Sequence, residues 1–299
     1  MSHAPIVLFV YNRPLHTRQT IDALLKNELA AESDLIIYSD APKKPEAAQA
    51  VQQVREYLAT ITGFASVSII LRERNWGLAN SVIDGVTSVV DRYGRVIVLE
   101  DDLLVAENFL SYMNLALDRY EGCSEVMQVS AYMFPVKTGS DHQAFFLPLT
   151  TSWGWATWKR AWECFDSSVP ESQLLNSRES RKAFDLQGAY PYSDMLASQL
   201  LGKIDSWAIR WYLCVFMRKG LVLYPPRSLV ENIGFDGSGT HCGKGDAAQS
   251  RTDSGLIEVE VGLFPTRVSA SMPHYEAIAG YMKSSGSGGV LNKIKRIFR

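Results

Sequence analysis

Short apolar runs alternate with segments of helical periodicity over the first 125 residues of the chain. The runs occupy residues 6–11, 34–40, 66–71 and 95–99. Uninterrupted runs of this length are typical of strands buried on both faces of a parallel sheet. The intervening segments space their apolar residues as helices do, with helices expected from about Pro14 and over about 46–59, 77–91 and 106–120. This order predicts an α/β fold, with a Rossmann-like, mostly parallel sheet flanked by helices.

The pattern of the second half, residues 126–283, is less regular. VMQVSA and AFFLPL are expected to be strands, and polar helices are expected over roughly 171–201. A helix over 207–219, a strand over 221–224 and a glycine-rich loop over 234–245 follow. Residues 284–299 form a third part, a Ser/Gly linker with a basic tail. The chain is therefore expected to comprise two halves of one domain and a flexible end.

Composition and charge fit an ordinary globular protein, with 46% hydrophobic and 21% charged residues. A net charge of −2 gives no sign of nucleic-acid binding. The four cysteines are widely spaced, which indicates neither a zinc site nor a disulfide framework and fits a reducing cytoplasm. The start of the chain does not resemble a signal peptide, and no apolar run approaches the ~18 residues of a membrane span. We therefore expect a cytoplasmic protein.

Three consecutive carboxylates, Glu100, Asp101 and Asp102, directly follow the strand over 95–99. Adjacent anions repel one another and resist burial, and a divalent cation offsets that cost. Mg²⁺ and Mn²⁺ bind such carboxylates together with substrate phosphates. In extended backbone, Glu100 and Asp102 would point one way and Asp101 the other. The pattern predicts a metal–nucleotide site at a strand's carboxyl end, and the alternative is an acidic first turn of a helix.

Other strand ends carry further candidates for nucleotide binding. Arg13 follows the first strand and suits a diphosphate, although it is equally compatible with a surface position at a helix start. Asp40 ends the second strand, where it can accept the imide N–H of uracil or serve as a turn aspartate. The segment RERNWGLANS, with Arg74, leads through a glycine turn into a helix start that suits an anion.

Tryptophans and one aspartate mark the second half. Trp155, Trp158 and Trp162 have helical spacing, which is typical of a core stripe. Trp153 and Trp155 flank a glycine, and either ring is a candidate to contact a sugar face. Asp205, at the start of a predicted helix, is a candidate general base or an N-cap residue, or both.

Two features near the end of the chain complete the candidates. His241, in the glycine-rich loop, is a candidate to close over a nucleotide or complete a metal shell, although a loop histidine is more often simply exposed. In the tail, apolar residues share one helical face opposite basic ones: Val290, Leu291, Ile294, Ile297 and Phe298. This pattern predicts peripheral binding to an anionic membrane surface, with a docking helix or a disordered end as alternatives.

Four segments resemble GT-A fold glycosyltransferases, most closely a bacterial relative of the N-acetylglucosaminyltransferase I type. They are FVYNRP, IIYSD, VIVLEDDLLVAENFLSYM, and WGWATWKRAWECFD followed by DSW. The resemblance implies that residues 1–125 bind the nucleotide sugar and residues 126–283 the acceptor. It implies Asp102 as the ligand of a manganese or magnesium ion, and Asp101 and Glu100 as contacts of the ribose and donor sugar. Arg13, Asp40 and Trp155 would contact the diphosphate, uracil and donor sugar, respectively, and Asp205 would be the catalytic base.

The resemblance implies an inverting, metal-dependent transfer of a sugar, expected to be an N-acetylhexosamine, from a UDP-sugar to a hydroxyl group. The predicted tail points to a glycan linked to a polyprenyl diphosphate as acceptor. A sugar-nucleotide pyrophosphorylase is an alternative, although YNRPLHTR lacks the glycines of its phosphate loop. A non-catalytic glycan-binding module is a third possibility, which leaves the acidic triplet unexplained.

Overall fold

The computed structural model describes residues 3–138, 142–168, 176–235, 256, 259–260 and 262–284. The first half alternates strands and helices as the apolar pattern predicts: β1 (Ile6–Val10), α1 (Pro14–Leu25), β2 (Asp34–Ser39), α2 (Ala48–Leu58), β3 (Ser66–Leu71), α3 (Leu78–Tyr93) and β4 (Arg95–Glu100). Short 3₁₀ turns, Ala30–Glu32 and Pro45–Ala47, precede β2 and α2. The α/β prediction for this half is confirmed.

Strands from both halves of the chain form one eight-stranded sheet in the order β3-β2-β1-β4-β8-β6-β9-β7. The second half contributes β6 (Val126–Ser130), β7 (Phe145–Leu147), β8 (Trp155–Trp158) and β9 (Leu221–Tyr224). Strands β3, β2, β1 and β4 run parallel, as do β6 and β9, whereas β8 and β7 are antiparallel to their neighbours. The prediction of a mostly parallel sheet is therefore confirmed.

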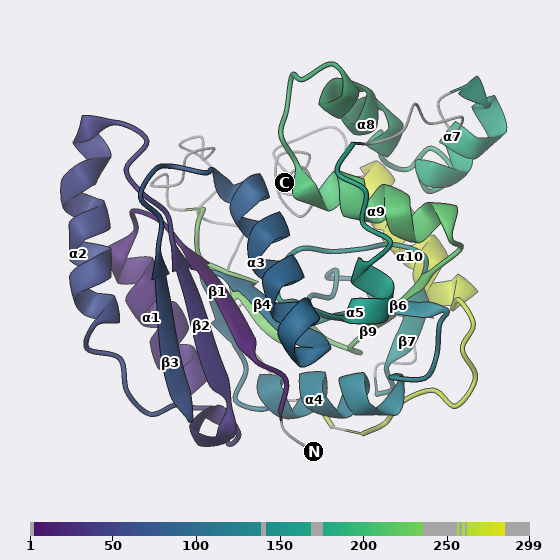
Figure 1. Cartoon of the computed structure of the whole chain (residues 1–299). Coiled ribbons are helices and arrows are strands. Elements are labelled where there is room, and N and C mark those ends of the chain that lie inside the picture. Colours follow the sequence, from purple (N-terminus) through teal and green to yellow (C-terminus); the bar gives the residue numbers. More distant parts are fainter. Residues whose placement is uncertain are drawn as a thin grey trace.

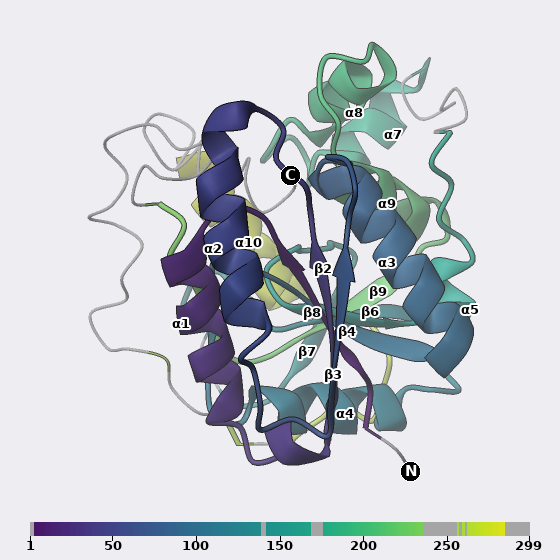
Figure 2. The same ribbon diagram turned by 60° about the vertical axis from the view of Figure 1, so that its left-hand side comes forward.

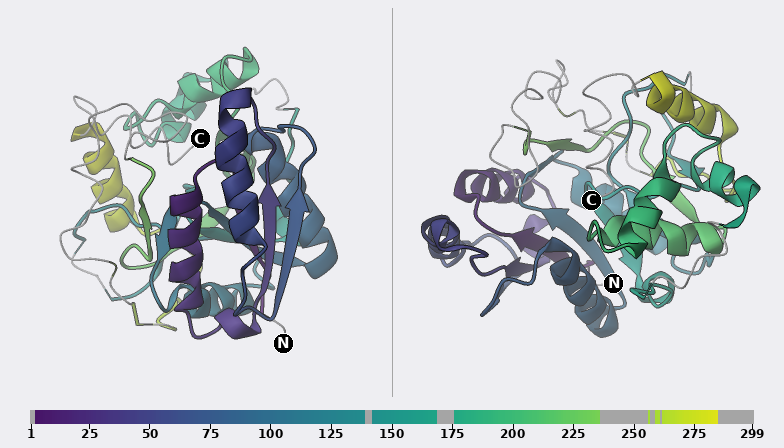
Figure 3. Two further views of the ribbon diagram at one scale, coloured as in Figure 1. Left: turned by 90° about the vertical axis from the view of Figure 1, so that its left-hand side faces the viewer. Right: turned by 90° about the horizontal axis from the view of Figure 1, so that it is seen from above.

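Helices cover both faces of the sheet. Figures 1 and 2 show α1 and α2 on one face of the β1–β3 region and α3 on the other. The carboxyl ends of β2 and β3 point to the top of Figure 2, where α7 (Arg178–Phe184) and α8 (Tyr192–Leu200) also lie. The left view of Figure 3 shows the same two helices above this edge. The second half thus overhangs the edge at which parallel α/β sheets bind ligands.

A small two-stranded sheet brings a distant segment to the acidic triplet. β5 (Leu103–Val105) pairs antiparallel with β10 (Val230–Asn232), so Leu103 lies opposite Asn232. The Ile233 N–H also donates to the Asp102 carbonyl oxygen at 2.9 Å. Residues 232–235 are thereby fixed beside the end of β4.

The remaining helices are α4 (Phe109–Arg119), α5 (Lys159–Trp162), α9 (Trp207–Met217) and α10 (Met272–Ser284). Strands β5 and β10 and helix α10 were not predicted from the sequence. The helical spacing of Trp155, Trp158 and Trp162 was misleading, because Trp155–Trp158 is the strand β8 and only Lys159–Trp162 is helical. The prediction that these tryptophans belong to the core is confirmed, since all three are buried. No described helix is long and apolar enough to cross a membrane. Tail residues 285–299 lie outside the described residues.

Candidate active site

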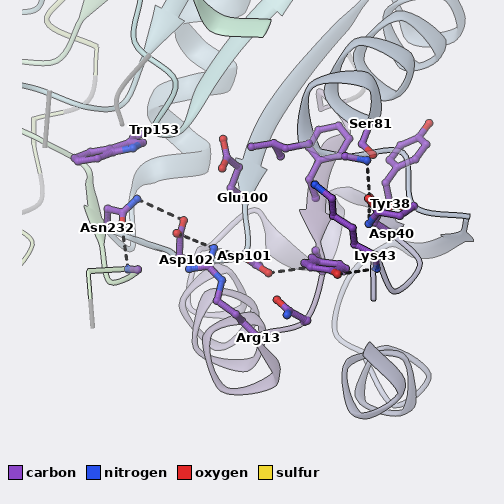
Figure 4. A pocket seen from close by; sticks show the side chains of 18 of the residues that line it. Arg13, Tyr38, Asp40, Lys43, Ser81, Glu100, Asp101, Asp102, Trp153 and Asn232 are labelled. Carbon is purple, nitrogen blue, oxygen red and sulfur yellow. Dashed lines mark hydrogen bonds and ion pairs between the residues drawn. The ribbon is translucent and has the colours of Figure 1, made fainter. Parts of the chain in front are cut away.

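A cavity of about 280 Å³ opens at the carboxyl ends of β1, β2 and β4 (Figure 4). It is bordered by β1 residues, the loop before α3, the acidic triplet and the segment after β10. The polar and aromatic side chains that line it are Phe9, Tyr11, Asn12, Arg13, Tyr38, Asp40, Lys43, Asn75, Ser81, Glu100, Asp101, Asp102, Trp153, Asn232 and Phe235. Arg13, Asp40 and the whole triplet, all singled out from the sequence, therefore share one cavity.

Arg13 is the cation at the centre of the acidic triplet. Its Nη2 lies 2.9 Å from Asp101 Oδ1 and 3.0 Å from Asp102 Oδ2. The chain turns directly after Glu100, so both aspartates reach the same guanidinium. The expected alternation of side chains therefore does not hold here. Burial disfavours the charge on Arg13, but Asp101 and Asp102 outweigh it and raise its pKa.

The two aspartates differ in how firmly the protein holds them. Asp101 is only 4% exposed, and its carboxylate also accepts the Tyr11 N–H at 3.2 Å. Thr20 Oγ1 donates to its carbonyl oxygen at 3.0 Å. Among the described residues, Asp102 Oδ1 has only a long contact, 3.4 Å, with Asn232 Nδ2. Asp101 is thus fixed by its surroundings, whereas Asp102 offers the more available carboxylate.

Glu100 faces the same cavity from the last position of β4 (Figure 4). Within the described part of the chain its carboxylate makes no hydrogen bond. Burial, followed by the charges of Asp102 and Asp101, raises the pKa of Glu100 to about 8, against a smaller opposing effect of Arg13. Burial also raises the pKa of Asp101. The triplet therefore concentrates more negative charge than Arg13 alone balances.

A divalent cation fits this donor set. Oxygen ligands with excess negative charge are what Mg²⁺ and Mn²⁺ bind, and substrate phosphates commonly complete their shell. Among the described residues no group of three or more His, Cys, Asp or Glu side chains is arranged to hold a metal by itself. The protein would therefore supply one or two carboxylates, with Asp102 as the more available of the two aspartates.

Asp40 organises the loop that leads into α3. Its Oδ1 accepts the N–H groups of Ala41 and Trp76, each at 2.9 Å. Its Oδ2 accepts the Gly77 N–H at 2.9 Å and Asn75 Nδ2 at 3.0 Å. Gly77 has φ +72°, which suits glycine, and α3 begins directly after it. A uracil contact through Asp40 would have to share an oxygen with one of these donors, since a carboxylate offers about four acceptor positions.

The structure separates the remaining donor-side candidates. Arg74 is exposed and does not line the cavity. Trp155 is completely buried in β8, where it stacks on Trp207 with ring centroids 5.0 Å apart. It does not line the cavity either, so its expected sugar contact is not supported by its placement. Trp153 lines the cavity instead, with its ring 4.8 Å from that of Tyr132 and 5.8 Å from that of Phe235.

Asp205 lies just before α9, outside the lining of the cavity. Its side chain is 59% exposed, and Oδ1 lies 2.7 Å from Arg210 Nη2. The N-cap of α9 is Ser206, whose Oγ accepts the Ile209 N–H at 3.3 Å. Asp205 is therefore not the N-cap residue, and its carboxylate is open to solvent. His241 lies outside the described residues.

The cavity residues that were not named as candidates from the sequence include Lys43, Ser81 and Asn232. Lys43 extends into the cavity, while its backbone N–H donates to Tyr11 Oη at 2.9 Å (Figure 4). Ser81 Oγ is buried without a hydrogen-bond partner among the described residues. Asn232 contacts Asp102 and accepts the Gly234 N–H at 2.8 Å. Ser81 ends the segment RERNWGLANS, which was singled out from the sequence, whereas Lys43 and Asn232 had no local signal.

The sequence itself identifies the family. Residues 6–160, more than half of the chain, match Glycosyl transferase family 2. The chain belongs to this family and is a glycosyltransferase, in agreement with the GT-A expectation. A comparison with curated protein sequences gave no match.

Several solved structures have folds similar to that of this chain. A mannosyltransferase, PcManGT from Pyrobaculum calidifontis in complex with GDP-Man and Mn²⁺, has 11% identity over 73% of this chain and 74% of its own, with a TM-score of 0.37. S. aureus TarS 1–349 has 12% identity over 76% of this chain and 59% of its own, with a TM-score of 0.39. Mouse xyloside xylosyltransferase 1 has 9% identity over 73% of this chain and 82% of its own, also with a TM-score of 0.39. The similarity is loose, and the family assignment rests on the sequence match.

Proposed function

We propose that this glycosyltransferase is an inverting, metal-dependent enzyme that transfers a sugar, an N-acetylhexosamine, from a UDP-sugar to a hydroxyl group. The observation that carries the proposal is the arrangement of Arg13 between Asp101 and Asp102 at the floor of the cavity. A guanidinium flanked by carboxylates matches a diphosphate that arrives with a divalent cation. The family assignment favours transfer over the pyrophosphorylase and the glycan-binding module.

The donor is oriented along the cavity by residues at its two ends. Asp102, with Glu100 nearby, would hold Mn²⁺ or Mg²⁺, which neutralises charge on the leaving diphosphate when bound. Arg13 contributes a further positive charge at the same place. The nucleoside extends toward Tyr38 and the Asp40 loop, where Ser81 Oγ offers an unused hydrogen-bonding group. Trp153 provides an aromatic surface for the donor sugar.

Asp205 is proposed as the general base that accepts the proton of the acceptor hydroxyl. Its exposed carboxylate stands before α9, and Arg210 holds one of its oxygens. In the inverting reaction the deprotonated hydroxyl forms a bond to the anomeric carbon. The bond from that carbon to the diphosphate breaks, and UDP leaves.

A lipid-linked acceptor is proposed from the tail. The basic amphipathic pattern of residues 290–299 fits an anionic membrane surface, and a glycan carried on a polyprenyl diphosphate is presented there. Flotation of the full chain with anionic vesicles tests this, compared with a chain ending at residue 284. Equal flotation of the two would count against it.

The test of the function separates donor binding from transfer. Wild-type protein, D205N and the control D91N are given UDP-N-acetylhexosamine, Mn²⁺ and a lipid-linked glycan, and released UDP and product are measured. Asp91 pairs with Lys159 on the surface and lies outside the cavity. D205N should bind UDP with wild-type affinity and lose at least about 100-fold in transfer rate, as expected for a general base. Loss of UDP binding in D205N would show that Asp205 is structural. Formation of UTP and a sugar 1-phosphate when pyrophosphate is added to the UDP-sugar would favour the pyrophosphorylase.

A further inference from the structure

The guanidinium of Arg13 stands where it competes with a metal for Asp102. Its Nη2 lies 3.0 Å from Asp102 Oδ2, an ion-pair distance. The second oxygen of Asp102 faces Asn232 Nδ2 at 3.4 Å. Of the two aspartates, Asp101 keeps its backbone partner Tyr11 whether or not Arg13 stays in place. Asp102 is therefore the carboxylate whose partner can change most readily.

Two cations on one carboxylate oppose each other. A divalent ion on Asp102 would lie beside the guanidinium of Arg13, which is only 18% exposed and thus poorly screened by water. A diphosphate relieves this conflict, because its oxygens match the fork of a guanidinium and also bind the metal. The same diphosphate can therefore take over Arg13 and share the cation.

We propose that Arg13 is an internal counter-ion that holds Asp102 in the free protein and exchanges it for the donor's diphosphate, so that metal and nucleotide bind with positive coupling. The inference rests on the proposed function, since it needs a diphosphate donor and a metal at Asp102. Coupling of this kind is reciprocal: the nucleotide strengthens metal binding by the factor by which the metal strengthens nucleotide binding. The protein would then bind the metal weakly until a donor arrives.

The test is titration of the full chain with Mn²⁺, followed by the electron paramagnetic resonance signal of free Mn²⁺, with and without saturating UDP. The variants are R13Q and the control R18Q. Arg18 is an exposed residue of α1, the helix that follows Arg13, and its guanidinium stacks on the Tyr57 ring. Wild-type protein and R18Q should bind Mn²⁺ at least about tenfold more tightly with UDP than without it. R13Q should bind Mn²⁺ alone about tenfold more tightly than wild type. It should gain less from UDP than wild type does, because only the direct contact between the diphosphate and the metal then couples the two ligands.

The outcomes separate this inference from the proposed function. If wild type binds Mn²⁺ with UDP, but R13Q binds Mn²⁺ alone no more tightly than wild type, the counter-ion role is overturned and the proposed function stands. If wild type binds neither Mn²⁺ nor UDP, the proposed function itself fails. Because R13Q leaves two aspartates without their cation, its fold is checked by circular dichroism. If R13Q does not fold, R13K is used in its place. An ammonium group matches two carboxylates less well than a guanidinium, so R13K should bind Mn²⁺ alone more tightly than wild type does. An Mn²⁺ affinity of R13K equal to that of wild type would overturn the counter-ion role.

Discussion

The backbone of Gly234 packs directly against the carboxylate of Asp102. A methyl group at position 234 would overlap Asp102 Oδ2 and lie 2.8 Å from Arg13 Nη1. A side chain at position 234 would therefore have to push the ends of Asp102 and Arg13 aside where the segment after β10 passes over the ion pair. This contact ties the second half of the chain to the acidic triplet of the first.

G234A should therefore displace Asp102 and Arg13 and weaken Mn²⁺-dependent UDP binding by about tenfold or more. The control is G122A, because a methyl group at Gly122 would meet nothing within 4 Å. Isothermal titration of UDP in the presence of Mn²⁺ measures the difference. Wild-type affinity in G234A would show that the backbone at 234 does not set the geometry of the site.

D40N should lower the free energy of unfolding as well as donor affinity. In D40N, the NH₂ group of the asparagine would face backbone N–H groups that now donate to the Asp40 carboxylate. Each buried donor left without an acceptor lowers the free energy of unfolding by about 1–3 kcal/mol. Urea unfolding measures the loss, and D34N at the partly exposed start of β2 serves as the control. A D40N protein as stable as wild type would mean that the loop before α3 does not depend on this carboxylate.

The two neighbouring tryptophans should behave differently on substitution by phenylalanine. W153F should raise the KM for the UDP-sugar while leaving UDP affinity nearly unchanged, because Trp153 lines the cavity. W155F should leave the KM unchanged and lower stability by about 1–3 kcal/mol, because Trp155 is fully buried against Trp207. Steady-state kinetics and urea unfolding distinguish them, and the reverse pattern would contradict the assignment of Trp153 to the donor sugar.

The placement of these tryptophans shows what the sequence could and could not predict. The apolar runs of β1, β2 and β4 were predicted closely, because strands buried on both faces have a simple signature. The run of β3 was also predicted, although β3 is the partly exposed edge strand and not the doubly buried strand that was expected. The spacing of Trp155, Trp158 and Trp162 was misinterpreted, because a strand that leads directly into a helical turn can mimic a helical stripe. Periodicity does not distinguish short buried segments of the two kinds.

Apart from Trp153, which precedes β8, the cavity residues that were predicted from the sequence lie at the ends of strands. Arg13, Asp40 and the acidic triplet follow β1, β2 and β4 and therefore meet at one edge. Asn232 and Gly234 reach Asp102 through the pairing of β5 with β10, a long-range contact without a local signature. The joint pairing of both aspartates with Arg13 was missed because extended geometry was assumed beyond Glu100, where the chain already turns.

The stability of the metal-free protein should fall as the pH rises, in part through Glu100. Burial and the neighbouring aspartates raise the pKa of Glu100 from 4.5 to about 8 in the folded protein. Between these values the folded state holds a proton that the unfolded state has released, so the free energy of unfolding decreases with rising pH. The E100Q substitution removes this contribution. As the pH rises from about 5 to about 8, the free energy of unfolding of E100Q should therefore fall by less than that of wild type. Urea unfolding in EDTA measures it, and equal losses would contradict the raised pKa.

In the proposed mechanism, Asp102 and its neighbours bind a nucleoside diphosphate through a divalent cation. Calorimetric titration of UDP into the wild-type protein, with Mn²⁺ or with EDTA, and into D102N with Mn²⁺ tests it most directly. We expect binding to wild type with Mn²⁺, and binding at least about tenfold weaker both in EDTA and in D102N. UDP affinity that is the same in all three titrations would contradict the account.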